Sequence, residues 1–197
     1  MHDQNRRSRG RPRIFDPEKA VVAGQRLFHA HGYEQVGLAA LTAAIGVNPP
    51  SFYAAFGSKA QFFGRVLDRY AAAALALEDI LRPGRRPVEA LADLLQRAAS
   101  SYAADPDARG CLVLEALRGD PADEHVRLAR LTAERRREQL HAFIAASHPA
   151  VASAATDFVA STMSGLSASA REGMEAERLL AVARLAAGVL PSLLAAG

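Results

Sequence analysis

The residues with the clearest chemical potential are basic and lie near the N-terminus. The segment at 9–13 alternates arginine with glycine and proline, so Arg9, Arg11 and Arg13 can follow an extended path. Such an arm fits the narrow minor groove of A·T-rich DNA, where the electrostatic potential is most negative. A solvated charged tail would have the same composition, and this motif alone leaves both interpretations open.

A second cationic position, Lys59, follows Ser58 directly. Ser58 and Gln61 have the spacing of a capping box, in which the serine hydroxyl accepts from the amide three residues later. The pattern therefore places Lys59 at the start of a helix, where free amides and the helix dipole favour an anion. A phosphate contact is the functional interpretation, and a solvated lysine is the alternative.

The charge is uneven along the 197 residues. Residues 1–70 carry ten Lys or Arg against five Asp or Glu, whereas residues 71–197 carry fourteen against sixteen. The N-terminal part is thus expected to meet a polyanion. No apolar run is long enough to span a bilayer, and no apolar signal segment follows the N-terminal arginines. The lone Cys111 excludes an intrachain disulfide, lies among apolar neighbours that favour a packed, inert thiol, and fits a reducing cytoplasm.

Elements that position these residues are predicted to be helical throughout. Alanine supplies 43 residues, tryptophan is absent, and β-branched residues are sparse, so we expect an all-α fold. A first helix should begin after Asp16 and stop at Gly32. A short helix ending at Gly46 is followed by one that Asn48 caps and Gly57 ends. Two short helices around a tight glycine turn have the spacing of a helix-turn-helix.

The remaining periodicity predicts six more helices, nine in all. We expect a fourth helix from Ser58 toward Leu81, and others at about 87–104, 110–118, 121–146, 149–171 and 175–195. The predicted organisation is a flexible basic arm at 1–15, a helix-turn-helix domain at 16–60, and a larger helical ligand-binding and dimerisation domain at 61–197.

The segment from Gly10 to Tyr70 resembles the TetR family of transcriptional regulators. The resemblance rests on motifs in the family's order and spacing: Gly10-Arg11-Pro12-Arg13, Phe28 with Gly32-Tyr33, Leu41 with Ile45-Gly46-Val47, Ser51-Phe52-Tyr53, Phe56 and Lys59. It implies a homodimer with a three-helix DNA-binding domain and a larger domain for ligand binding and dimerisation. The helices near the C-terminus resemble the dimer-forming end of one branch more weakly.

The resemblance also implies residue roles in DNA binding. Tyr53 and Lys59 would contact phosphates. Base-reading positions at and near the helix that starts at Asn48 correspond to Ala39, Pro49, Pro50, Ser51 and Ala54. Among these base-reading residues only Ser51 can form a side-chain hydrogen bond to a base. Contacts with thymine methyl groups and recognition of DNA shape must therefore add to the sequence specificity. Gly37 stands where the family usually has a serine or threonine, so a phosphate contact there would use a backbone amide.

The larger domain is expected to hold a ligand and a second copy of the chain. A pocket lined from the helices at 87–146 would involve the predicted ligand residues Tyr102, Leu112, His141 and Phe143. The last two predicted helices carry more apolar faces than one small core can absorb, which indicates a two-fold four-helix interface. Its predicted residues are Phe158, Met163, Leu166, Val182, Leu185 and Val189.

Catalytic and metal-binding patterns are not found in the sequence. A nucleophile elbow, a P-loop, a GxGxxG motif and an HExxH helix do not occur. The histidines lack ligand spacing, so we expect no metal and no cofactor. The arginine run at 135–137 has acidic neighbours and is interpreted as a solvated helix face.

These observations predict a cytoplasmic DNA-binding regulator rather than an enzyme. We expect a repressor that binds a palindromic operator as a homodimer and is released by a small apolar or amphipathic molecule. A non-specific architectural DNA binder that uses the arm in the minor groove is one alternative, but it leaves the C-terminal 125 residues unexplained. A small-molecule enzyme built on a helical bundle is the other.

Overall fold

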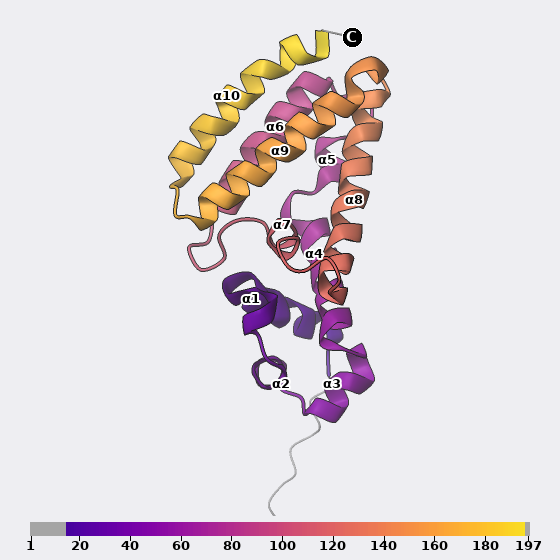
Figure 1. The fold of residues 1–197 in the computed structure, drawn as a ribbon, viewed down its shortest axis with the longest axis vertical. Coiled ribbons are helices and arrows are strands. Elements are labelled where there is room, and N and C mark those ends of the chain that lie inside the picture. The colour runs from indigo at the N-terminus through magenta and orange to yellow at the C-terminus, as the bar shows by residue number, and fades with distance from the viewer. Residues whose placement is uncertain (1–14, 196–197) are drawn as a thin grey trace, which may run out of the picture.

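The structure is a computed structural model that describes residues 15–195, and within that range every regular element is a helix (Figure 1). The helices are α1 (Pro17–Gln35), α2 (Leu38–Ile45), α3 (Pro49–Phe56), α4 (Lys59–Ala74), α5 (Leu77–Ile80), α6 (Pro87–Tyr102), α7 (Leu112–Ala116), α8 (Glu124–Ala145), the 3-10 turn η1 (Pro149–Val151), α9 (Ala152–Arg171) and α10 (Ala176–Ala195). The all-α prediction is confirmed. The predicted arm residues Arg9, Arg11 and Arg13 lie outside the described residues.

Three N-terminal helices begin where side-chain caps were predicted. The Asp16 carboxylate accepts from the amides of α1, Asn48 Oδ1 accepts from the amide of Ser51 at 2.9 Å, and Ser58 Oγ accepts from the amide of Gln61 at 3.0 Å. Each cap satisfies a backbone donor that the first helical turn leaves free. The starts of α1, α3 and α4 thus follow directly from local sequence chemistry.

Two breaks differ from the sequence prediction. Gly32 has φ of 78° and interrupts α1, but one further turn carries the chain to Gln35. The predicted fourth helix is in fact two, because α4 ends at Ala74 and Ala76 adopts φ of 41° before α5. In a continuous helix Leu75 and Leu77 would point about 200° apart. The break lets both leucines enter the same core.

The N-terminal core is aromatic and extends beyond the three helices of the helix-turn-helix. Phe28, Phe52, Phe56, Phe62 and Phe63 are buried and stack edge to face between α1, α3 and α4. Helices α1 and α4 approach closely at Gly24, where a Cβ atom would overlap the Phe62 ring. The same core includes residues of α7 and α8, and His29 Nε2 donates to the carbonyl of Gly110 at 3.1 Å. The predicted domain boundary near residue 60 stays a prediction.

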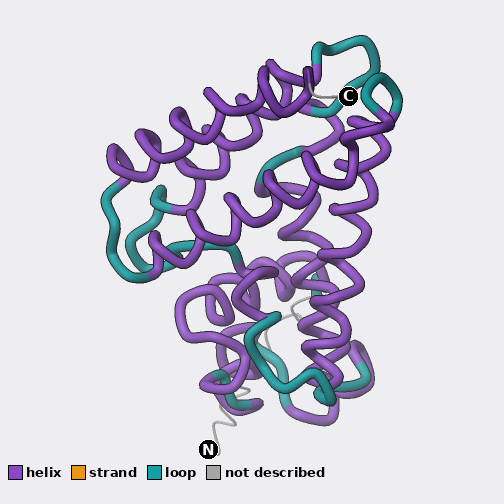
Figure 2. The backbone as a smooth tube through the Cα atoms, turned by 45° about the horizontal axis from the view of Figure 1, so that its top comes forward, coloured by secondary structure: helices purple, strands orange, loops and turns teal. Residues whose placement is uncertain are grey.

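The C-terminal core lies within a bundle in which α10 packs on α6 and α9, and α8 packs on α4 and α9 (Figures 1 and 2). Helix α10 is long and apolar enough to cross a membrane by length and mean composition, although Glu177, Arg178 and Arg184 interrupt its apolar run. One face of it, however, buries Leu179, Ala183, Leu190 and Leu194 within the bundle, as expected for a packed helix of a globular domain. The helix-turn-helix lies at the opposite end of the molecule from the top of this bundle.

Candidate DNA-binding surface and ligand cavity

The predicted base-reading positions, together with the predicted DNA-binding residues Gly37 and Asn48, belong to one exposed surface at the α2–α3 end of the molecule (Figure 1). Its residues are all solvent-exposed: Gly37, Ala39, Asn48, Pro49, Pro50, Ser51 and Ala54. Behind this surface, Leu41 and Phe52 anchor α2 and α3 in the aromatic core. A left-handed Gly46, with φ of 73°, makes the tight turn between the two helices. Apart from Asn48, whose side-chain oxygen caps α3, this surface consists of small or apolar residues and the hydroxyl of Ser51.

The two predicted phosphate-contact residues differ in exposure. Tyr53 is 51% exposed, so its hydroxyl is available to a partner. Lys59 is half-buried, and its Nζ lies 4.0 Å from the centroid of the Tyr33 ring. Burial lowers the pKa of Lys59, although the Glu34 carboxylate opposes that shift. The ammonium group is thus held on an aromatic face at the start of α4, a geometry that stabilises a cation.

Tyr33 also joins the N-terminal helices to α8. Its ring stacks on His125 with 3.8 Å between centroids, and burial raises the pKa of Tyr33 to about 12. His125 Nε2 lies 3.5 Å from a Glu34 oxygen, and Asp123 completes a three-residue group of metal-ligand types within 4.8 Å. Two of the three residues are exposed, and Lys59 brings a positive charge to the same junction. The group is accounted for as a polar contact between α1 and α8.

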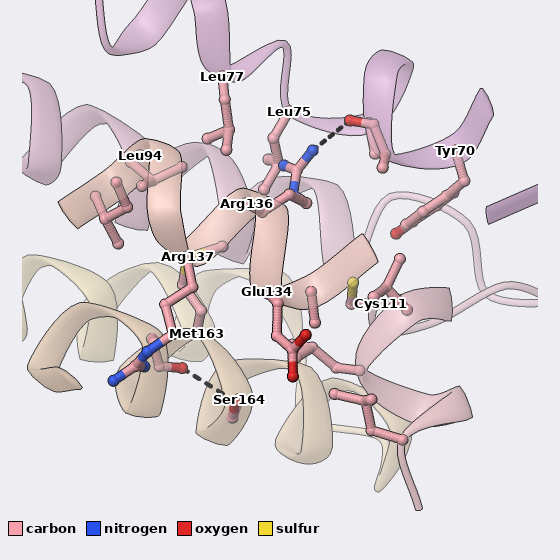
Figure 3. Close-up of a pocket in the computed structure, with 18 of the residues that line it drawn as sticks. Tyr70, Leu75, Leu77, Leu94, Cys111, Glu134, Arg136, Arg137, Met163 and Ser164 are labelled. Atoms are coloured by element: carbon pink, nitrogen blue, oxygen red, sulfur yellow. Dashed lines mark hydrogen bonds between the residues drawn. The ribbon is translucent and has the colours of Figure 1, made fainter. Parts of the chain in front are cut away.

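A cavity of about 420 Å³ lies between α4, α5, α6, α7, α8 and α9 (Figure 3). Leucine, valine, alanine and methionine side chains form most of its wall, with Leu75 and Leu77 at the break between α4 and α5. A cavity of about 150 Å³ already accepts benzene. The present cavity therefore has room for a considerably larger apolar molecule.

A few polar groups interrupt this apolar wall. Tyr70, Cys111 and Arg136 point into the same space (Figure 3). Burial, followed by proximity to Cys111, raises the pKa values of both Tyr70 and Tyr102, so the two phenols stay protonated. The Tyr102 hydroxyl is fully buried and has no hydrogen-bond partner among the described residues. Arg136 Nη1 donates to the carbonyl of Ala71 on α4.

Of the four predicted ligand residues, the structure places only Tyr102 on the cavity wall. Leu112 is the first residue of α7 and turns instead into the N-terminal core. His141 is exposed, with Nε2 3.4 Å from Ser153 Oγ, and Phe143 packs against the C-terminal core. The α8 residues on the cavity wall run from Arg130 to Leu140, so positions 141 and 143 lie further along the helix, beyond the end of the cavity.

Arg136 corrects the interpretation of the 135–137 run as a solvated face. Arg135 is exposed beside Asp68, at 3.4 Å, and Arg137 pairs with Asp157, but Arg136 is half-buried in the cavity wall. The signal was present in the helical phase, because Arg136 stands three residues after Ala133 and four before Leu140. Sequence reasoning also missed Tyr70, which lines the cavity from α4. Cys111, expected to be packed, is half-buried and lines the cavity.

The predicted dimer-interface residues of α9 and of α10 differ in solvent exposure. Val182, Leu185 and Val189 of α10 are exposed on one face, and Leu185 is 76% exposed. Leu166 of α9 is only 3% exposed inside the C-terminal core. Met163 lines the cavity, and Phe158 is partly buried against the same core. Helix α10 therefore provides an outward apolar face, whereas the three α9 side chains pack mainly against other parts of the same chain.

An exposed helix-turn-helix on a helical ligand-cavity domain defines a DNA-binding regulator fold, and comparison with known proteins identifies its family. Residues 21–66 match the family described as bacterial regulatory proteins, tetR family. The HTH-type transcriptional repressor BdcR of Escherichia coli K12 is 42% identical over 187 residues, which is 94% of each chain. The repressor ComR of the same organism is 32% identical, with 95% of each chain covered.

A solved structure gives the same result in three dimensions. A cysteine-substituted form of the TetR family transcriptional regulator CifR, complexed with 26-bp double-strand operator DNA, has a TM-score of 0.75 and 37% identity. The match covers 90% of this chain and 98% of that one. The chain belongs to the TetR family of transcriptional regulators, and its relatives are repressors rather than enzymes.

Proposed function

We propose that the protein is a cytoplasmic repressor that binds a palindromic operator as a homodimer and is released when a small apolar or amphipathic molecule enters the cavity. Two features joined by one helix carry this proposal. The exposed helix-turn-helix surface lies next to the first turn of α4, and the other end of α4 lines the cavity. Operator binding by the similar regulator CifR supports the first half.

DNA contacts are assigned by position on the exposed surface. Pro49, Pro50, Ser51 and Ala54 on α3, with Ala39 on α2, would face base edges, and Ser51 would supply the one side-chain hydrogen bond. Tyr53 and Lys59 would contact phosphates on either side, together with the backbone amides at Gly37 and Asn48. Arg9, Arg11 and Arg13 would add minor-groove contacts.

Release follows from the course of α4. Lys59 lies at its first turn, and Tyr70, Ala71 and Ala74 near its other end line the cavity. A helix of 16 residues is about 24 Å long and stiff. A ligand that shifts its cavity end therefore moves its DNA end as well. In a dimer this changes the separation of the two reading surfaces, which must match half-sites one helical turn apart.

A homodimer is proposed from the exposed apolar face of α10. Val182, Leu185 and Val189 recur at helical spacing, and the nearby alanine and glycine residues let two helices approach closely. A two-fold interface would present two copies of the reading surface to a two-fold DNA site.

A gel shift on the DNA upstream of the protein's own gene tests the proposal. A sequence-specific repressor retains this DNA against excess non-specific competitor. An architectural DNA binder, which is the alternative that also uses the basic arm, loses it in proportion to the competitor. Failure to discriminate between the two DNAs would refute operator binding.

A further inference from the structure

The cavity holds an arginine that no carboxylate neutralises. Arg136 is half-buried on the wall, and among residues 15–195 no aspartate or glutamate oxygen lies within ion-pair distance of its guanidinium. In the described part of the chain only one of its donors is used, in the bond to the Ala71 carbonyl. A guanidinium has five N–H donors, so several remain for another partner.

The same wall offers a second free donor. Among residues 15–195 the buried Tyr102 hydroxyl has no hydrogen-bond partner and only the weakly polar Cys111 thiol beside it, and burying such a group without a good hydrogen bond is costly. Because the phenol stays protonated, it can donate to an oxygen atom. Figure 3 shows the cavity space that Arg136 borders, with Cys111 and the Tyr70 ring on its other side.

Charges around the cavity favour a negative guest. Three arginines line it, against a single carboxylate, Glu134. Glu134 is exposed, so water screens its charge, and the positive charge of Arg137 is already paired with Asp157. Arg130 is exposed as well, so the half-buried Arg136 is the cavity arginine that water screens least.

We propose that the cavity selects an apolar organic acid, whose carboxylate meets Arg136 and the Tyr102 hydroxyl while its hydrocarbon body lies against the leucines. This inference rests on the proposed function, because it names the chemical class of the molecule that would release the repressor. The apolar wall alone would accept neutral molecules equally well. The unpaired guanidinium and the unpartnered hydroxyl are what add a preference for a carboxylate.

Matched ligands test the preference directly. Calorimetry on the DNA-free protein compares the carboxylate, alcohol and amine of one skeleton: 4-phenylbutanoate, 4-phenylbutan-1-ol and 4-phenylbutylamine. A second series, octanoate, octan-1-ol and octylamine, replaces the aryl body by a linear chain. We expect the carboxylate to bind at least about tenfold more tightly than the amine in one or both series, a difference of about 1.4 kcal/mol.

Variants assign the preference to residues. Arg136→Gln should remove the tenfold advantage of the carboxylate and leave the affinity for the alcohol unchanged, whereas Arg136→Lys, which keeps the charge, should retain most of it. Tyr102→Phe should weaken the carboxylate several-fold. Arg135→Gln is the matched control, because it removes a neighbouring charge that lies outside the cavity, and it should change no affinity.

Three outcomes would overturn the inference. They are equal affinities for the carboxylate and the amine in wild-type protein, binding of none of the six compounds, or a folded Arg136→Gln protein that keeps the preference. The comparison of carboxylate and amine affinities in the wild-type protein tests the inference even if a variant fails to fold. A parallel gel shift separates the two proposals: a protein that binds its operator but lacks the preference refutes only the ligand class, and a protein that does not bind its operator refutes the proposed function.

Discussion

Replacing Leu185 with arginine would test the proposed α10 interface. The side chain is 76% exposed in the single chain, so the substitution should change the stability of the protomer by no more than about 0.5 kcal/mol. In a two-fold dimer each copy would bury its leucine against the other. Burying one leucine contributes about 1.5–3 kcal/mol, and symmetry doubles the loss.

The dimer should therefore lose at least about 3 kcal/mol, and two arginines brought together would add repulsion. That loss raises the dimer dissociation constant by more than about 100-fold. Light scattering over a protein concentration series should report monomers for Leu185→Arg. Operator binding in a gel shift should be abolished, and the far-UV circular dichroism should stay largely unchanged.

A matched control is Leu131→Arg, which places the same charge at a leucine that is 51% exposed on α8, away from α10. This variant should remain dimeric and bind the operator. A Leu185→Arg protein that behaves as the Leu131→Arg protein does would show that the two copies meet elsewhere.

Three further predictions address other parts of the structure. Lys59→Ala should weaken binding to all DNA sequences alike and reduce the magnitude of the salt slope in a titration by about one unit for each phosphate that the lysine neutralises; an unchanged slope would remove Lys59 from the DNA-binding residues. Gly24→Ala should destabilise the protein by about 1–2 kcal/mol in urea unfolding, because the overlap with the Phe62 ring outweighs the better helix propensity of alanine; a more stable variant would refute the close approach of α1 and α4. Burial lowers the pKa of His29, so the unfolded chain takes up a proton first as the pH falls below about 6.5, and stability is lost from there toward the lower pKa of the folded state. His29→Gln should flatten this part of the curve of unfolding free energy against pH. An identical curve would show that His29 does not cause the loss.

The helix-turn-helix could be predicted from the sequence because its limits are set locally. Asn48 and Ser58 cap the helices that follow them, and Gly46 and Gly57 end the helices before them. Each signal acts within one turn of the chain, so no knowledge of tertiary packing was needed. The family resemblance lies in the same segment.

The cavity could not be predicted in the same way, because its wall combines residues from six helices. Tyr102 and Arg136 are 34 positions apart, and their meeting depends on how α6 and α8 pack. The break at Leu75 is a tertiary effect as well: local propensity favours a continuous alanine-rich helix, and the burial of two leucines in one core overrides it. For Arg136 the sequence did hold a signal, which is its position on the same face of α8 as Ala133 and Leu140. That position distinguishes Arg136 from its exposed neighbours Arg135 and Arg137.

Contacts around α4 determine what a ligand could move. Arg69 donates to Gln25 Oε1 at 2.7 Å, and Gly24 lies against the Phe62 ring, so α1 is fixed to α4 along most of its length. Toward the far end, α4 is joined to α8 by the bond from Arg136 to the Ala71 carbonyl and by contacts of Asp68 with Thr132 and Arg135. A carboxylate that bound the remaining donors of Arg136 would draw the guanidinium from Ala71 and weaken this one tie between α4 and α8, while leaving α1 and α4 joined. The expected motion is therefore a rigid shift of the whole helix-turn-helix unit rather than a rearrangement within it.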